Sequence, residues 1–186
     1  MHRLIAVIAA CSVSLTTFAI EDIVLPSGFS IEEYADVPNA RSLALGANGT
    51  VFASNRSGGG VFAVVSEGGV TRTITLDDGL QTPNGIAFHE GDLYVAEIDR
   101  VYRYDDIESN LDNVPDPVVL NIDLPSEKWH GWRYIGFGPD NKLYISIGAP
   151  CNICEEPGYA QIIRMNADGS ERETYATGIR NSVGLT

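Results

Sequence analysis

The sequence has few basic residues, few cysteines and a single long apolar run, and each shortage excludes a class of protein. Only 12 lysines and arginines stand against 25 aspartates and glutamates, which gives a formal net charge of −13. So acidic a surface repels phosphate backbones, and nucleic-acid binding is therefore not expected. After the N-terminal apolar run, no later run is long enough to span a membrane. Stretches with a helical period of 3.6 residues are almost absent, which favours an all-β fold.

The apolar run at the N-terminus is typical of a secretory signal peptide. Two processing routes stay open: cleavage after Thr17-Phe18-Ala19, or lipidation of Cys11 after Ile8-Ala9-Ala10. The first is favoured because the second leaves only a short apolar core. We therefore predict a signal peptide over residues 1–19 and a mature domain over residues 20–186. Export to the periplasm or the medium follows, with a lipid anchor at Cys11 as the alternative.

Two of the three cysteines lie in one short loop, Cys151-Asn152-Ile153-Cys154, among turn-forming residues. In an exported protein this spacing favours a local disulfide between Cys151 and Cys154. A haem attachment site would need histidine after the second cysteine, where Glu155 stands. A zinc site would need two more ligands, and the sequence has no second pair of cysteines.

A unit of strand, polar turn and strand recurs along the chain. Its copies cover residues 43–54, 86–97 and 135–146, and a fourth copy begins at Val183. Equivalent residues are 43, 49 and 48 positions apart, which matches the blade of a β-propeller at about 40 to 50 residues. The fold predicted is all-β, a β-propeller with about three blades and the first strand of a fourth.

Propeller blades bury their faces only by packing in a closed ring of typically four to eight blades. Three blades do not close such a ring. We therefore expect residues 20–186 to be a partial propeller, the N-terminal part of a longer protein, and to be inactive on its own.

The loops before the first strand of each blade converge in a propeller and carry its function. Asn84 and Asn181 each lie two residues before such a strand, and His130 lies five before it. Trp129 and Trp132 flank this histidine, an environment in which imidazole can serve as a base near neutral pH.

The residue before Asn181 is an arginine. The guanidinium of Arg180 suits the carboxylate or carbonyl oxygens of a planar anionic cofactor. These residues together predict a ligand site where the loops meet.

Several of these segments resemble one family. They are His130 with Gly138-Pro139-Asp140, Lys142-Leu143-Tyr144 with Gly148, residues 163–170, and residues 178–185, which match a G-x-R-N-x-x-G-L pattern. The chain resembles the glucose/sorbosone dehydrogenase family, the quinoprotein propellers that use pyrroloquinoline quinone (PQQ), and is most similar to its sorbosone dehydrogenase-like branch. The resemblance implies six blades in the complete protein and oxidation of an aldose or related aldehyde.

The resemblance also implies roles for individual residues. His130 would be the general base that deprotonates the sugar while hydride passes to the quinone. Arg180 and Asn181 would bind the quinone, and Gln81, Trp129 and Trp132 would bind the substrate. The family's calcium ligands belong to later blades beyond Thr186, so no metal site is assigned in this chain. The electron acceptor is not indicated.

The sequence departs from the glucose-oxidising branch in three places. Trp129 stands where that branch has an aspartate before the base, and Gln81 is near that branch's glutamine before the second blade but not in register with it. The Cys151–Cys154 loop follows Ile147-Gly148, where other members often have an aspartate. Two alternatives therefore stay open. One is a calcium-dependent lactonase-type propeller, and the other is a propeller that binds a sugar or a partner without catalysis.

Overall fold

The computed structural model describes residues 23–185, and the chain divides into two units, Met1–Tyr34 and Ala35–Thr186. In the first unit, residues 23–34 form no strand or helix. The predicted signal peptide and Cys11 lie outside the described residues. Between residues 23 and 185 there is no helix of the length and apolarity that a membrane crossing requires.

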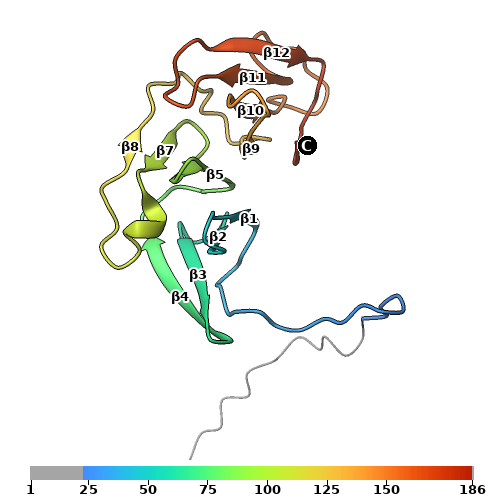
Figure 1. Cartoon of the computed structure of the whole chain (residues 1–186). Coiled ribbons are helices and arrows are strands. Elements are labelled where there is room, and N and C mark those ends of the chain that lie inside the picture. Colours follow the sequence, from blue (N-terminus) through green and yellow to red (C-terminus); the bar gives the residue numbers. More distant parts are fainter. Residues whose placement is uncertain (1–22, 186) are drawn as a thin grey trace, which may run out of the picture. The chain divides into compact units, whose positions relative to one another are not determined.

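The second unit contains three four-stranded antiparallel sheets, each built from strands consecutive in the sequence (Figure 1). Such meanders are the blades of a propeller, so the predicted all-β propeller fold is confirmed. The first blade comprises β1 (Ser42–Leu45), β2 (Val51–Ser54), β3 (Val61–Glu67) and β4 (Val70–Asp77). The second comprises β5 (Gly85–His89), β6 (Asp92–Ala96), β7 (Val101–Tyr104) and β8 (Val118–Val119), with the 3-10 helix η2 (Ile107–Ser109) between β7 and β8. The third comprises β9 (Ile135–Phe137), β10 (Leu143–Ile147), β11 (Gln161–Met165) and β12 (Glu173–Thr177).

One predicted strand differs from the structure. Residues 183–185, expected to begin a fourth blade, are not in a strand. A strand needs a hydrogen-bonded neighbour to satisfy its backbone groups, and within the described part of the chain this segment pairs with none.

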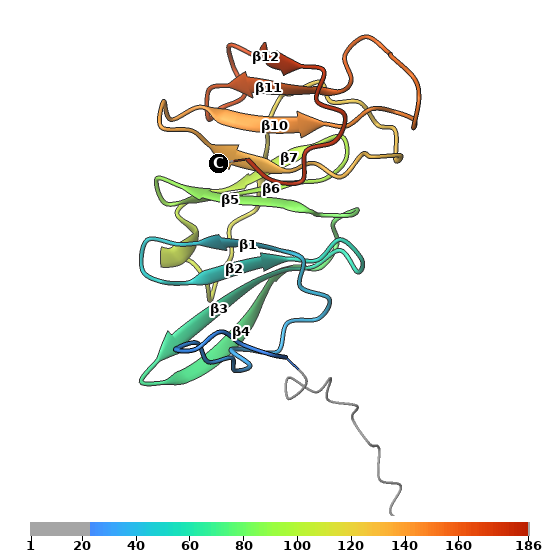
Figure 2. The same ribbon diagram turned by 90° about the vertical axis from the view of Figure 1, so that its right-hand side faces the viewer.

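The blades stack in chain order, as Figure 2 shows, with β5 in contact with both β1 and β9. Alternate residues of each strand point to opposite faces, and apolar residues occupy the faces that meet. Phe52, Val61 and Leu93 belong to the core between the first and second blades. Tyr94, Leu143 and Ile145 belong to the core between the second and third. These cores hold the first strands of the three blades side by side.

Antiparallel pairing sends the connections alternately to two ends of the sheets. We call the end where β1, β5 and β9 begin the entrance end. The connections at this end are residues 55–60, 78–84, 97–100, 120–134, 148–160 and 178–182. Every predicted site residue from Gln81 to Asn181 lies in one of them, so the topology brings all of the predicted site to one end.

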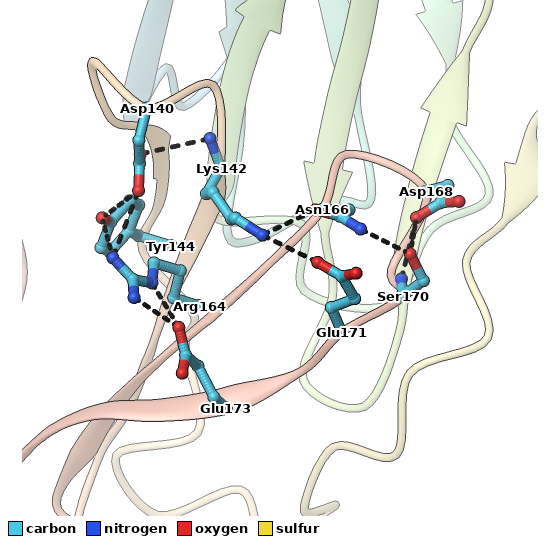
Figure 3. A network of polar contacts seen from close by, with 9 residues as sticks. All are labelled: Asp140, Lys142, Tyr144, Arg164, Asn166, Asp168, Ser170, Glu171 and Glu173. Carbon is cyan, nitrogen blue, oxygen red and sulfur yellow. Dashed lines mark hydrogen bonds and ion pairs between the residues drawn. The ribbon is translucent and has the colours of Figure 1, made fainter.

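The other end of the third blade carries a polar network, shown in Figure 3. Lys142 Nζ donates to Asn166 Oδ1 over 2.8 Å and to Glu171 Oε2 over 3.1 Å. Arg164 donates to Asp140 and Glu173. These contacts tie the turn after β9 to the turn after β11. Residues 138–142 and 163–170, which carry part of the family resemblance, therefore build the blade rather than line the entrance end.

Candidate functional site

His130 is half-buried at the entrance end, immediately before the third blade. Its Nδ1 lies 2.8 Å from the carbonyl oxygen of Ala149. A carbonyl oxygen only accepts hydrogen bonds, so Nδ1 carries the proton and Nε2 of the neutral ring keeps its lone pair. The backbone φ of His130 is 51°, a left-handed conformation that non-glycine residues adopt rarely and that surrounding contacts must hold.

Asn181 lies close to His130 because the residue between them, Gly148, has no side chain. A Cβ at position 148 would lie 2.7 Å from His130 Cβ and 2.9 Å from Asn181 Oδ1. Both distances are too short for a carbon atom to occupy. The absence of a side chain at Gly148 thus permits the close approach of two residues that the sequence placed at separate blade entrances.

Arg180 reaches the same place through its backbone. The N–H of Ala149 donates to the carbonyl oxygen of Arg180 over 2.7 Å. Its guanidinium donates to Asn152 in the Cys151–Cys154 loop. Two of the five guanidinium N–H donors are used there, and three are left for a ligand.

A cavity of about 290 Å³ opens at the entrance end. Residues at the start of β1 and just before β5 and β9, together with residues 181–183, line it, so each blade contributes to its wall. Polar donors and aromatic rings predominate in the lining: Arg41, Ser42, Asn84, Trp132, Tyr134, Asn181 and Ser182. This mixture suits a ligand that has both flat and polar parts.

Of the predicted site residues, Trp132 and Asn181 line the cavity. Trp129 does not; it is 58% exposed, and its ring meets the ring of His130 edge-on with centroids 5.6 Å apart. Gln81 is exposed, and its backbone N–H donates to the carboxylate of Glu97. Its predicted role in substrate binding stays a prediction, since the cavity described above does not include it.

Arg56 lies in a loop that carries little besides glycine and serine, and its sequence gives no sign of a role in the site. Its guanidinium carbon lies 3.7 Å from the centre of the Trp132 ring, within the range of a cation–π interaction. The contact joins a first-blade loop to the connection before the third blade. Arg56 therefore orients the cavity's tryptophan and brings a positive charge near its wall.

A chain of buried hydrogen bonds connects the three blade entrances. Ser54 Oγ, at the end of β2, donates to the carbonyl oxygen of Asn84 over 2.9 Å. Asn84 Nδ2 then donates to the carbonyl oxygen of Arg133 over 3.0 Å. Asn84 is 8% exposed, so water does not readily replace these partners and the chain fixes the entrances relative to one another.

Asn84→Ala is expected to lower the free energy of unfolding by about 1–3 kcal/mol, because the buried carbonyl of Arg133 loses its donor. Urea unfolding followed by tryptophan fluorescence measures the change. Asn121→Ala is the control, since Asn121 is exposed. Equal stability of the two variants would show that the Asn84 side chain does not connect the blades.

Arg133 is among the largest side chains that are fully buried, and only 1% of it is exposed to solvent. Its Nε donates to Ile98 O over 2.7 Å, and one terminal nitrogen donates to Pro125 O over 2.5 Å. Burial lowers the pKa of Arg133 to about 10, which leaves the side chain charged at neutral pH. Arg133 follows His130 by three residues, and nothing in the sequence indicates its burial.

The connection containing His130 is also tied to the connection containing the cysteines. The hydroxyl of Tyr159 donates to the carboxylate of Glu127. This hydrogen bond lowers the pKa of Glu127 and raises the pKa of Tyr159 to about 12. Within the second connection, the sulfurs of Cys151 and Cys154 are bonded, with Cα atoms 5.6 Å apart.

Comparison with known proteins places the fold but not the chemistry. No family model matches the chain. A protein of Borreliella burgdorferi, described only as uncharacterized, is 25% identical over 190 aligned positions. The match covers 93% of this chain and 49% of the relative, so the chain spans about half the length of the curated protein it matches.

Solved structures give the same picture. The PQQ domain of pyranose dehydrogenase from Coprinopsis cinerea, in its holo form, superposes with a TM-score of 0.67 at 19% identity, over 80% of this chain and 41% of that one. A Trichoderma reesei protein of carbohydrate-active family AA12 gives 0.63 at 23% identity, over 78% and 42%. Virginiamycin B lyase from Staphylococcus aureus gives 0.51 at 16% identity, over 78% and 45%. At these identities the likeness establishes the propeller fold alone.

Proposed function

We propose that this chain belongs to a PQQ-dependent sugar oxidoreductase of the sorbosone dehydrogenase-like type, in which His130 is the general base. The observation that carries the proposal is the meeting of His130 and Asn181 across Gly148, next to a cavity with a tryptophan wall. Similarity to the pyranose dehydrogenase PQQ domain supports it at the level of the fold.

The described residues fit one side of a planar anionic quinone. Trp132 offers a ring face, Asn181 an amide, and Arg41 a guanidinium at the cavity. Arg180 keeps three N–H donors beyond those given to Asn152. Trp132 and Asn181 would hold the group at the cavity through ring contact and hydrogen bonds. Arg180, which contacts Asn152 rather than lining the cavity, would add its remaining donors from beside it. When bound, the quinone supplies a two-electron acceptor for sugar oxidation.

His130 would take the proton from the sugar hydroxyl at Nε2. Its Nδ1–H is already committed to Ala149 O, so the ring enters the reaction in the required tautomer. The same carbonyl stabilises the imidazolium that forms, since it faces the positive charge. Ala149 O therefore does in this chain what a carboxylate partner does for many catalytic histidines.

Calcium, export and the complete protein are further parts of the proposal. The described residues contain no group of three or more acidic, histidine or cysteine side chains that could hold an ion. We propose that the calcium ligands lie in later blades. The chain spans only 41–49% of the length of these similar proteins. This supports a longer protein whose further blades close the propeller ring. We propose that it is exported and uses a small sugar as substrate.

The test uses the complete protein in its apo form. PQQ is titrated with and without calcium while its absorbance is followed, and dye reduction is then measured with a panel of aldoses. We expect saturable PQQ binding, and sugar-dependent dye reduction that requires both additions.

Two other outcomes would contradict the proposal and identify its replacement. Binding of PQQ with no turnover of any aldose would favour a propeller that binds without catalysis. Metal-dependent hydrolysis of a lactone, with no PQQ binding, would favour the lactonase-type alternative.

A further inference from the structure

The segment from Gly148 to Cys154 contacts all three residues assigned to the reaction. The carbonyl oxygen of Ala149 accepts from His130, and its N–H donates to Arg180 O. A Cβ at Gly148 would lie 2.9 Å from Asn181 Oδ1, so the backbone of Gly148 passes close to that side chain. One short stretch of chain after β10 therefore sets the positions of the base and of both cofactor-binding residues.

Within this segment, Asn152 holds the guanidinium of Arg180 at two points. One terminal nitrogen donates to the backbone carbonyl of Asn152, and the other donates to its side-chain Oδ1 over 2.7 Å. Two parallel bonds from a charged fork fix direction as well as distance. Both partners are exposed, so the contact depends on the loop holding Asn152 in place rather than on burial.

The loop has little else to hold it. Ile153, at its tip, is 98% exposed and adds no packing. The disulfide between Cys151 and Cys154 encloses Asn152 and Ile153 and restricts the conformations of the residues it spans. The orientation of Asn152, and through it that of Arg180, thus depends on this bond.

We propose that Asn152, held in the disulfide-closed loop, is a positioning residue that orients the Arg180 guanidinium for ligand binding. The ligand-binding part rests on the proposed function, whereas the contact between Asn152 and Arg180 does not. The first part of the test therefore measures the contact alone, and the second measures PQQ binding.

The contact is tested by arginine-specific labelling with phenylglyoxal, which condenses with both terminal guanidinium nitrogens. These are the two nitrogens that Asn152 occupies. In the complete protein, Asn152→Ala and the double variant Cys151→Ser/Cys154→Ser should label faster at Arg180, several-fold relative to Arg72 in the same sample, as judged by peptide mass spectrometry. Ile153→Ser, in the same loop, should label like the wild type. Unchanged labelling in Asn152→Ala would overturn the proposal.

Binding is tested by PQQ titration of the same variants in the presence of calcium. Asn152→Ala should weaken PQQ affinity about tenfold, the effect of one charge-assisted hydrogen bond, with an unchanged Tm. Faster labelling with unchanged affinity would show that Asn152 holds Arg180 but would overturn its role in binding. If the wild type binds no PQQ, the proposed function fails, and the labelling result alone decides the contact.

Discussion

His130→Asn is expected to lower kcat/KM for quinone-dependent sugar oxidation by about 100- to 10,000-fold, the contribution of a positioned general base. Asparagine is the sharper replacement for two reasons. It tolerates the left-handed backbone conformation at this position better than most residues, and its amide can still donate to Ala149 O. The variant thus removes the proton acceptor at Nε2 while keeping the local fold. Steady-state dye reduction in the complete protein measures the loss.

The control for this substitution is His89→Gln. His89 lies at the far end of β5 and stacks on Phe137 with ring centroids 3.9 Å apart. It should keep turnover close to the wild-type value. PQQ affinity should be preserved in His130→Asn, because the base acts on the substrate and not on the cofactor. Near-normal turnover by His130→Asn would remove this residue from the mechanism.

The fold was predictable because its cause is periodic. Blades repeat the same strand, turn and strand, and the spacing of Leu43, Ile86 and Ile135 places the first strand of each blade within one residue of its start. The fourth copy at Val183 was wrong as a strand within the described residues, since the motif alone does not supply a pairing partner. Periodicity thus predicts strands only where a neighbour is available.

The candidate site was predictable only in part. Antiparallel topology brings His130, Arg180 and Asn181 to one end, which the repeat frame anticipated. The stacking of Arg56 on Trp132 was not foreseen, because it joins loops of different blades and leaves no local pattern in the sequence. By contrast, the Gly138-Pro139-Asp140 motif carries part of the family resemblance but does not belong to the site. Asp140 is part of the polar network of Figure 3, at the end of the third blade opposite the cavity.

Arg133→Met is expected to destabilise the protein by about 3 kcal/mol, because two partly buried carbonyls lose their donors. Two effects compete in this substitution. The buried cation has no acidic group within salt-bridge distance among the described residues, so its removal relieves a desolvation cost. Against this, Ile98 O and Pro125 O would be left unpaired beside an apolar side chain.

We expect the loss of donors to the two carbonyls to outweigh the relief of desolvation, so that Arg133→Met is destabilising. The reason is that a guanidinium is weakly hydrated and costs less to bury than an ammonium. Arg133→Lys is a second, informative variant. Arg133→Lys keeps the charge but replaces the planar fork with a strongly hydrated point charge, so it should be less stable than Arg133→Met. Urea unfolding gives the order, with the exposed Arg72→Met as a control expected to change stability by no more than about 0.5 kcal/mol. If Arg133→Met were as stable as the wild type, desolvation would be the larger effect, and the connection carrying His130 would have to be held in place by other contacts such as the hydrogen bond from Tyr159 to Glu127.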